Sequence, residues 1–261
     1  MKLKDKTAII SGGSRGIGGA CVELFAQEGA NVVIGDVLEA DGQALADKLG
    51  DKVVFKRLDV TQEESWADAV ATAEAQFGGV DILVNCAGIL TFNHVADLTA
   101  EEVRKTLDVN LYGTIIGTQA VIPPMRKRGA GSIVNISSTD GLIGSNAHAA
   151  YIASKWGVRG FTKAAALELG LENIRVNSIH PGGVDTPLAN PMNEEREEYN
   201  KRFVTFAAQR ACDPTEIAQG VLFFASDDGS YCMGSDLAID GGLTAGLYYY
   251  GHPGAPDIKF G

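Results

Sequence analysis

The sequence predicts a single α/β domain: a doubly wound, Rossmann-type sheet of about seven mostly parallel strands with helices on both faces. Short β-branched runs alternate with longer segments of helical apolar spacing, which is the pattern of a βαβ series. A glycine-rich turn follows the first run, as in nucleotide-binding folds. The 261 residues suffice for one large domain and contain no Pro/Ser/Gly linker, so we expect one domain over 1–261.

The strand runs are mostly apolar throughout, which fits strands covered on both faces. They lie at 7–10, 31–36, 53–60, 81–85, 131–137, 174–181 and 236–242. Segments of helical spacing lie at 18–29, 40–49, 63–77, 101–128 and 150–171. Two stretches break the alternation, namely 182–212 and a tail at about 243–261. Within the first stretch, residues at about 188–210 are amphipathic and are expected to form a lid over the substrate. The tail carries three consecutive tyrosines, and we expect it to pack on a neighbouring subunit.

The composition is acidic, with 33 Asp and Glu against 22 Lys and Arg and a net charge of -11. Such a surface disfavours nucleic acid and anionic membrane as partners. No run approaches the roughly 20 apolar residues of a membrane helix, and the start does not resemble a signal peptide, so we expect a cytoplasmic protein. The four cysteines and four histidines lack metal-ligand spacing and predict neither a disulfide framework nor a metal site.

The glycine-rich turn places Gly12, Gly16 and Gly18 between the first strand and the first helix. Backbone N–H groups there and the helix N-terminus favour a bound pyrophosphate. The Gly-x3-Gly-x-Gly spacing leaves room for Ser14 and Arg15 to line the loop. An ordinary tight βα turn is the weaker interpretation, because the three glycines coincide with the strand-to-helix junction.

Asp36 ends the second strand, where a carboxylate accepts hydrogen bonds from both ribose hydroxyls of an adenosine. A 2′-phosphate would meet a like charge there, which favours NAD(H) over NADP(H). Arg15 acts in the opposite direction as a phosphate partner, but the repulsion from Asp36 acts at the discriminating atom and receives more weight. Asp59, at the end of the third strand, is expected to bind the adenine amino group; a turn aspartate is the alternative.

Tyr151 and Lys155 are four residues apart on a predicted helix and therefore share one face. A phenol with a pKa of about 10 is a poor acid or base at neutral pH, and an adjacent ammonium is expected to lower that pKa. Such a pair accepts a proton from an alcohol as hydride leaves the carbon, without a metal. Taken alone, the pair would be interpreted by default as an exposed Tyr and Lys on a helix.

Ser138 strengthens the catalytic interpretation, because it follows a strand and precedes Tyr151 by 13 residues. A hydroxyl at the carboxyl end of a strand faces the ligand crevice of an open α/β sheet and can hold the substrate oxygen. Asn110 is a poor helix former within 101–128. Its carbonyl is a candidate to bind a water that leads from Lys155 to solvent, and a buried amide at a helix kink is the alternative.

The chain resembles the short-chain dehydrogenase/reductase family over nearly its whole length. The matching pieces are SGGSRGIG at 11–18, Asp36, LDV at 58–60, NCAG at 85–88, Asn110, IVNISS at 133–138, YIASK at 151–155 and RVNSIHPGGVDTP at 175–187. The resemblance implies a homotetramer whose catalytic set is Asn110, Ser138, Tyr151 and Lys155, with Tyr151 as the general acid/base. It also implies that Tyr151 and Lys155 contact the cofactor together with Ile17, Val60, Asn85, Ala87, Gly88, Pro181, Gly182, Val184 and Thr186.

Two positions depart from the family pattern. Ser11 stands where the family usually has Thr, which retains a hydroxyl. Cys86 replaces the usual second Asn of the NCAG segment. It is either a reactive thiol or a small buried hydrophobe, and its place at the end of a core strand favours the second.

Within the family, residues 151–170 and 177–187 most resemble bacterial hydroxysteroid dehydrogenases of the 3α,20β type and related enzymes of alicyclic secondary alcohols. The mostly apolar character of the predicted pocket suits a bulky ring that carries one hydroxyl or ketone. We expect His148 to be a second polar contact there or, with more weight, a solvent-facing loop histidine. The predicted pocket residues are Ser138, Asp140, Leu142, His148, Tyr151, Leu188, Phe203 and Phe206.

These observations predict an NAD-dependent oxidoreductase that interconverts a cyclic secondary alcohol and its ketone. One alternative is an NADPH-dependent reductase of 3-oxoacyl or other carbonyl substrates, which Asp36 and the absence of a basic patch disfavour. Another is a non-catalytic sensor of dinucleotides, which the presence of Ser138, Tyr151 and Lys155 together disfavours.

Overall fold

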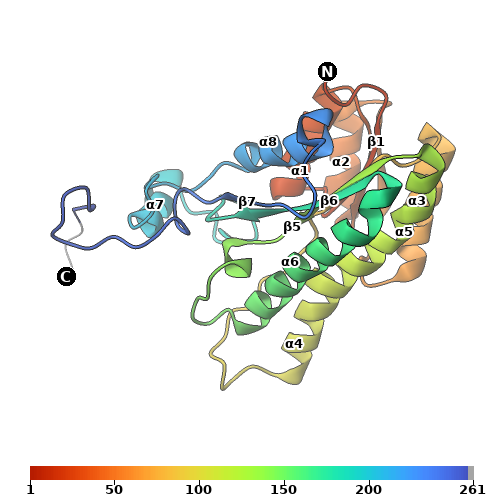
Figure 1. Ribbon diagram of the computed structural model, residues 1–261. Helices are drawn as coiled ribbons and strands as arrows, with labels where there is room; N and C mark the ends of the chain where they lie inside the picture. The colour runs from red at the N-terminus through yellow and green to blue at the C-terminus, as the bar shows by residue number, and fades with distance from the viewer. Residues whose placement is uncertain (258–261) are drawn as a thin grey trace.

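The computed structural model describes residues 1–257, and its centre is a seven-stranded sheet in the order β3-β2-β1-β4-β5-β6-β7 (Figure 1). Every neighbouring pair of strands is parallel. The strands are β1 (Thr7–Ser11), β2 (Asn31–Asp36), β3 (Val53–Arg57), β4 (Ile82–Asn85), β5 (Gly131–Ile136), β6 (Ile174–Pro181) and β7 (Asp236–Ile239). The doubly wound parallel sheet predicted from the sequence is confirmed, although β3 and β7 are shorter than their apolar runs.

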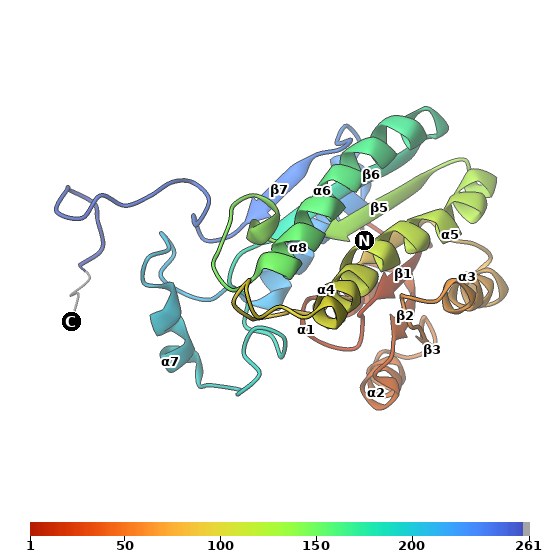
Figure 2. The same cartoon turned by 90° about the horizontal axis from the view of Figure 1, so that it is seen from below.

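Helices cover both faces of the sheet (Figures 1 and 2). One layer consists of α1 (Gly16–Gln27), α2 (Glu39–Leu49) and α8 (Pro214–Ala225). The other consists of α3 (Glu63–Phe77), α5 (Gly113–Arg128) and α6 (Ala149–Leu169), with α4 (Ala100–Leu107) beside α6. Each layer buries its own apolar cluster against the sheet, around Phe25 and Phe224 on one side and Trp66 and Met125 on the other. A sheet with both faces covered explains the continuous apolar strands.

The helix expected over 101–128 is interrupted in its first half. A π-helical turn at Asp108–Tyr112 separates α4 from α5 and carries Asn110. The wider turn directs the Asn110 side chain into the protein, where the residue is 1% exposed. Gly113 then allows close packing on the third-strand segment, because a Cβ there would lie 2.9 Å from Cγ2 of Val60.

Helix α8 was not predicted from the apolar pattern, although its start has a clear signal. The Asp213 side chain accepts a hydrogen bond from the Thr215 amide, and the Glu216 carboxylate accepts one from the Asp213 amide. This is a capping box with Pro214 at the first helical position. The sequence Asp-Pro-Thr-Glu before an apolar run is therefore the feature that would have located this helix.

The strand order reverses at β1, which lies between β2 and β4. In open α/β sheets, ligands bind beyond the carboxyl ends of the strands at this switch point. The segment after β6, which includes α7 (Arg196–Asn200), and the chain that follows β7 extend beyond the same end of the sheet (Figure 1). The tail runs away from the sheet with Leu247 and Tyr249 exposed, and its residues 258–261 lie outside the described residues. Within residues 1–257, no helix combines the length and the apolar character needed to cross a bilayer.

Candidate active site

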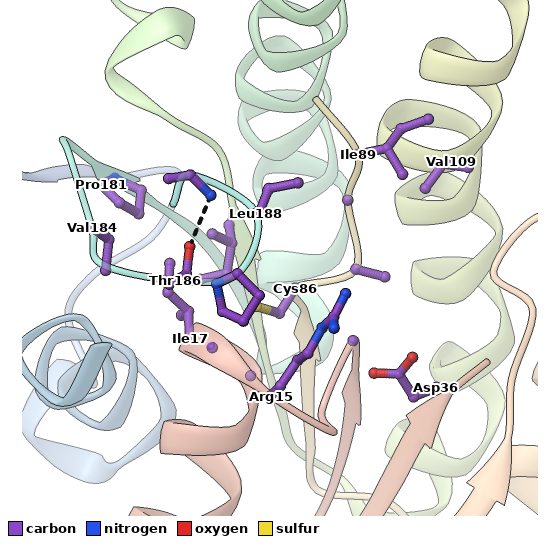
Figure 3. A pocket seen from close by; sticks show the side chains of 18 of the residues that line it. Arg15, Ile17, Asp36, Cys86, Ile89, Val109, Pro181, Val184, Thr186 and Leu188 are labelled. Carbon is purple, nitrogen blue, oxygen red and sulfur yellow. Dashed lines mark hydrogen bonds between the residues drawn. The ribbon is translucent and has the colours of Figure 1, made fainter. Parts of the chain in front are cut away.

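A cavity of about 400 Å³ opens at the switch point, beyond the carboxyl ends of the central strands (Figure 3). Its lining runs from Asp36 and Leu38, after β2, to Ser138, after β5, and includes Leu188 and Ala189 from the segment after β6. Most residues predicted to contact the cofactor line this cavity. These are Gly12, Arg15, Gly16, Ile17, Gly18, Asp36, Asp59, Val60, Ala87, Gly88, Tyr151, Lys155, Pro181, Gly182, Val184 and Thr186.

The glycine-rich turn is shaped by close backbone contacts. Gly12 has φ +65°, and a Cβ on it would lie 2.7 Å from the Ala87 backbone. A Cβ on Gly18 would lie 2.1 Å from the Gly12 carbonyl oxygen. Helix α1 begins at Gly16 without a side-chain cap, so the N–H groups of its first turn are available to an anion in the cavity. A backbone cradle at an uncapped helix N-terminus fits a dinucleotide pyrophosphate.

Asp36 is held in place by the backbone around it. Its carboxylate accepts hydrogen bonds from the amides of Ser14, at 3.0 Å, and Leu38, at 3.1 Å. Ser14 does not line the cavity as predicted, because its amide supports Asp36 and its hydroxyl points to the Leu38 carbonyl. Arg15 is exposed at the mouth of the loop, near Asp36 (Figure 3).

Asp59 and Asn85 have different positions relative to the cavity. Asp59 lines it, and its Oδ1 also accepts hydrogen bonds from the amide and the hydroxyl of Thr61, so the alternative of a turn aspartate also describes it. Asn85 is buried away from the lining, and its Nδ2 donates to Oδ1 of Asn135 at 2.9 Å. Asn85 therefore links β4 to β5, and the structure does not place its side chain along the cavity as predicted.

Tyr151 and Lys155 lie in the first two turns of α6 and face the cavity together. Nζ of Lys155 donates a hydrogen bond to the Ile136 carbonyl at 2.8 Å and lies 5.5 Å from the centre of the Tyr151 ring. Burial lowers the pKa of Lys155 to about 8. Burial also raises the pKa of Tyr151 to about 12, and a hydrogen bond with Ser138 acts in the opposite direction. The lowered phenol pKa that the sequence predicted is thus not found here, because dehydration of the phenol dominates.

The end of β5 is tied to α6 residue by residue. The Ile136 carbonyl accepts from Lys155 Nζ, and the hydroxyl of Ser137 donates to the Lys155 carbonyl at 3.1 Å. Ser138 follows as the next residue and lines the cavity, and its Oγ accepts from the Asp140 amide at 3.1 Å. These bonds hold the Ser138 hydroxyl and the Tyr151 phenol on the same side of the sheet.

Asn110 lies behind this pair and not in the cavity lining. Its Nδ2 donates to the Ile89 carbonyl and to Oγ of Ser154, and its Oδ1 accepts from the Ile89 amide. The Asn110 carbonyl accepts from the Thr114 hydroxyl at 2.9 Å. The buried amide at a helix irregularity, the alternative left open by the sequence, describes this geometry. Asn110 fixes the segment after β4 against α6.

The comparisons with known proteins agree with this geometry. A family model described as enoyl-(acyl carrier protein) reductase matches residues 12–244. The chain belongs to the short-chain dehydrogenase/reductase family. The crystal structure of a short-chain type dehydrogenase/reductase from Mycobacterium marinum is similar to it, with a TM-score of 0.88 and 33% identity, covering 94% of this chain and 98% of that one.

Curated relatives within the family share more of the sequence. A 3-alpha-(or 20-beta)-hydroxysteroid dehydrogenase of Mycobacterium tuberculosis is 46% identical, covering 94% of this chain and 92% of the relative. A trans-4-hydroxycyclohexanecarboxylate dehydrogenase of Sinomonas cyclohexanicum is 44% identical, covering 94% and 95%. A cyclopentanol dehydrogenase of a Comamonas species is 43% identical, covering 94% and 99%.

On the substrate side of this short-chain dehydrogenase/reductase, three of the predicted residues line the cavity: Ser138, Tyr151 and Leu188. Asp140 and His148 lie beside them as a pair, with Nδ1 of His148 2.8 Å from Oδ2 of Asp140. The His148 ring lies 6.2 Å from the Tyr151 ring, between centres, and its side chain is 24% exposed. His148 is therefore partly buried against Asp140 and does not line the cavity, so it lies between the two expectations of a pocket contact and a solvent-facing histidine.

The predicted lid contributes less to the cavity than expected. Phe203 and Phe206 do not line it; they stack edge-to-face with each other at 5.2 Å, and Phe203 also contacts Tyr199. Phe203 packs closely on Gly183, where a Cβ would lie 1.9 Å from its ring. The two phenylalanines thus form the small core of the lid segment itself. Leu142 is likewise absent from the cavity lining.

Several lining residues were not predicted from the sequence. Each lies within two residues of a predicted residue or belongs to a strand end, which is the signal that could have found it. These residues are Val37, Leu38, Leu58, Cys86, Ile89, Val109, Ile136, Ser137, Pro187 and Ala189. Burial raises the pKa of the Cys86 thiol to about 12, which supports a protonated, hydrophobic side chain over a reactive thiolate. Among residues 1–257, no group of three or more His, Cys, Asp or Glu side chains is arranged to hold a metal ion.

Proposed function

We propose that this protein is an NAD-dependent dehydrogenase that interconverts a secondary alcohol and its ketone on a bulky, apolar, cyclic substrate. The observation that carries the proposal is one cavity that joins Asp36 at the nucleotide end to Ser138, Tyr151 and Lys155 at the other. The named activities of the relatives support the substrate class, because a hydroxysteroid, a hydroxycyclohexanecarboxylate and cyclopentanol are all alcohols built on an alicyclic ring.

The side chains at the reacting end have complementary tasks. Bound NAD supplies the hydride acceptor for alcohol oxidation and, when reduced, the hydride donor for ketone reduction. The Ser138 hydroxyl holds the substrate oxygen, and the Tyr151 phenol gives or takes its proton. Lys155, turned to the Ile136 carbonyl, fixes the start of α6 and supplies positive charge beside the phenol. With its pKa raised to about 12, Tyr151 is protonated at neutral pH and is ready to act as the acid in ketone reduction.

Asp36 supports the choice of NAD. Its carboxylate lines the cavity and is fixed by two backbone amides, so it cannot turn away from an incoming ligand without losing both hydrogen bonds. A 2′-phosphate at this position would meet a buried like charge, whereas ribose hydroxyls would find an acceptor. The NADPH-dependent reductase is accordingly the disfavoured alternative.

The substrate end combines apolar walls with one polar pair. Ile89, Leu188 and Ala189 supply apolar surface to the cavity that Tyr151 lines, and the His148 ring of the Asp140–His148 pair lies 6.2 Å from the phenol ring, between centres. The 188–210 segment begins at the cavity and is braced behind it by the ion pair of Arg196 with Asp185. We expect it to close over bound cofactor and substrate, in a cytoplasmic homotetramer.

The test is a screen of cyclic secondary alcohols, including steroids, monoterpenols and cyclohexanols, with NAD⁺ and NADP⁺ in parallel and dinucleotide reduction measured by absorbance. We expect turnover with NAD⁺ on at least one of these classes. Tyr151→Phe should abolish that turnover and retain NADH binding, whereas the control Tyr112→Phe, at an exposed tyrosine, should leave it unchanged. Activity of Tyr151→Phe within a few-fold of the wild type, or a preference for NADP⁺, would contradict the proposal.

A further inference from the structure

A buried histidine that the proposed mechanism does not use lies directly behind the catalytic serine. His180, near the end of β6, is 0% exposed and does not line the cavity. Its Nδ1 lies 2.8 Å from the backbone carbonyl oxygen of Ser138. Because a carbonyl can only accept, Nδ1 carries a proton and donates it to this hydrogen bond. The imidazole therefore holds the backbone of the residue whose hydroxyl faces the substrate.

The opposite edge of the ring is held as well. Nε2 of His180 lies 3.1 Å from Oγ of Ser178 and 3.4 Å from Oδ1 of Asp236, at the start of β7. The Ser178 hydroxyl also lies 2.8 Å from the same carboxylate oxygen. Two neighbouring strands thus fix the plane and the direction of the ring, so that its other nitrogen points at Ser138.

Asp236 connects this unit back to the catalytic helix. Its Oδ2 accepts from Nε of Arg159 at 2.8 Å and pairs with Nζ of Lys163 at 2.9 Å. Both residues belong to α6, one and two turns beyond Lys155. Burial would raise the pKa of Asp236, but hydrogen bonds from Lys163, Arg159 and Ser178 outweigh it and lower that pKa, so the carboxylate stays charged.

The bonds form a closed path through four elements. From α6 the path runs to Asp236 on β7, then to His180 on β6, and then to Ser138 just after β5. It returns to α6 through the bonds that Ser137 and Ile136 make with Lys155. Ile136 and Ser137 are bound by Lys155 directly. The Ser138 carbonyl accepts two hydrogen bonds, one from His180 and a local one from the Gly141 amide at 2.9 Å. The bond from the imidazole is the one that ties the Ser138 backbone to β6 and, through Asp236, to α6.

We infer that His180 is a positioning residue of the reaction: through its Nδ1–H it fixes the Ser138 backbone, and thereby the serine hydroxyl, at the distance from Tyr151 that proton transfer requires. The inference rests on the proposed function, because it assumes that Ser138 and Tyr151 act on one substrate oxygen. Displacement of a catalytic group by about 1 Å costs about 100-fold in rate, so an effect of this size on kcat is the expected signature.

The experiment compares two amides that replace different nitrogens of the ring. The side-chain amide of His180→Asn reaches the position of Nδ1 and can donate to Ser138, whereas that of His180→Gln reaches the position of Nε2 and leaves the Ser138 carbonyl with only the local bond from the Gly141 amide. We expect His180→Asn to keep kcat within about threefold of the wild type and His180→Gln to lower it at least about tenfold. The KM for alcohol, NADH binding and Tm should differ little between the two variants.

Equal kcat values for the two variants, or a fall in kcat that follows the loss of Tm, would overturn the inference and reduce His180 to a packing role. If neither variant folds, Asp236→Asn replaces them, because it loosens the ring without removing it: kcat should fall at least about threefold at unchanged KM, and an unchanged kcat would overturn the inference. An inactive wild type with every alcohol would instead contradict the proposed function, which separates the two failures.

Discussion

The ammonium group of Lys155 donates to the backbone carbonyl of Ile136 at 2.8 Å, which places a buried charge against the end of β5. Only 5% of the lysine is exposed, and burial lowers its pKa to about 8. The folded protein thus holds a cation whose dehydration opposes folding. Groups with a shifted pKa in an active site commonly destabilise the fold in this way, because the burial that shifts the pKa also removes water from the charge.

Replacement of Lys155 by methionine should therefore abolish activity and raise the free energy of unfolding at pH 7. Below pH 8 the wild type bears the whole cost of a lysine pKa lowered from 10.5 to about 8, which is about 3 kcal/mol, and loss of the bond to Ile136 offsets about 2 kcal/mol of it. Between pH 8 and about 10.5 the unfolded chain binds more protons, so wild-type stability rises with pH. At pH 9.5 less than half of the cost remains, so the gain of about 1 kcal/mol seen at pH 7 should be lost there.

Urea unfolding of the cofactor-free proteins at equal concentration, at pH 7 and pH 9.5, measures this gain. A Lys155→Met variant less stable than the wild type at pH 7 would show that the hydrogen bond to Ile136 outweighs the dehydration of the ammonium.

The pKa of about 12 at Tyr151 predicts that kcat/KM depends on pH differently in the two directions of the reaction. Alcohol oxidation needs the phenolate as base, and its fraction increases with pH up to that pKa. Ketone reduction needs the protonated phenol, which predominates throughout the neutral range. We expect kcat/KM for the alcohol to rise from pH 7 to about pH 10 and kcat/KM for the ketone not to rise. Initial rates in both directions measure this, and an oxidation profile that is flat over the range would contradict it.

Replacement of Asp36 by serine should transfer cofactor preference toward NADP⁺. The change removes the like charge and leaves Arg15 as a phosphate partner, so kcat/KM for NADP⁺ should rise at least about tenfold. Loss of the hydrogen bonds from Ser14 and Leu38 should also destabilise the protein, by about 1–3 kcal/mol.

The double variant with Arg15→Ala is the control for that experiment, because it removes the new phosphate partner and should return NADP⁺ use toward the wild-type level. If the ratio of NAD⁺ to NADP⁺ use does not change in Asp36→Ser, a group other than this carboxylate determines the cofactor.

Removal of residues 248–261 should weaken the oligomer. The described part of the tail extends from the sheet with Tyr249 71% and Tyr250 46% exposed, and large aromatic side chains so placed favour burial on a second subunit (Figure 1). We expect light scattering to show a smaller assembly for the truncated chain. If the tail lies at the cavity of a neighbouring subunit, the KM for alcohol should also rise. An oligomer and kinetics identical to those of the full chain would show that the tail has neither role.

Local features of the sequence were enough to locate most of the site. One cavity is lined by the glycines of the first turn, by the carboxylate at the end of β2 and by both Tyr151 and Lys155. These predictions work because the required geometry is short-range: a turn needs particular backbone conformations, and residues four apart on a helix share a face.

Other predictions failed where a side chain can point either into the cavity or into the surrounding protein. Asn85 and Ser14 lie in the motifs predicted to contact the cofactor. The Asn85 side chain, however, binds Asn135, and the Ser14 amide binds the Asp36 carboxylate. Phe203 lies in the predicted lid and packs within it instead of facing the substrate. Sequence position near a site does not determine which way a side chain turns, because that depends on which neighbour completes its hydrogen bonds or its packing.

The sequence by itself determined the class of sheet, the glycine-rich turn after β1 and the spacing of the groups proposed to react, because apolar runs and short spacings encode them locally. Tertiary structure alone decided what holds those groups in place. His180 and Ser138 are 42 residues apart and meet because β5 pairs with β6, and Asp236 reaches the same ring because β7 pairs with β6. Strand order is a property of the whole folded chain, so the contacts it creates between distant residues have no local signature in the sequence.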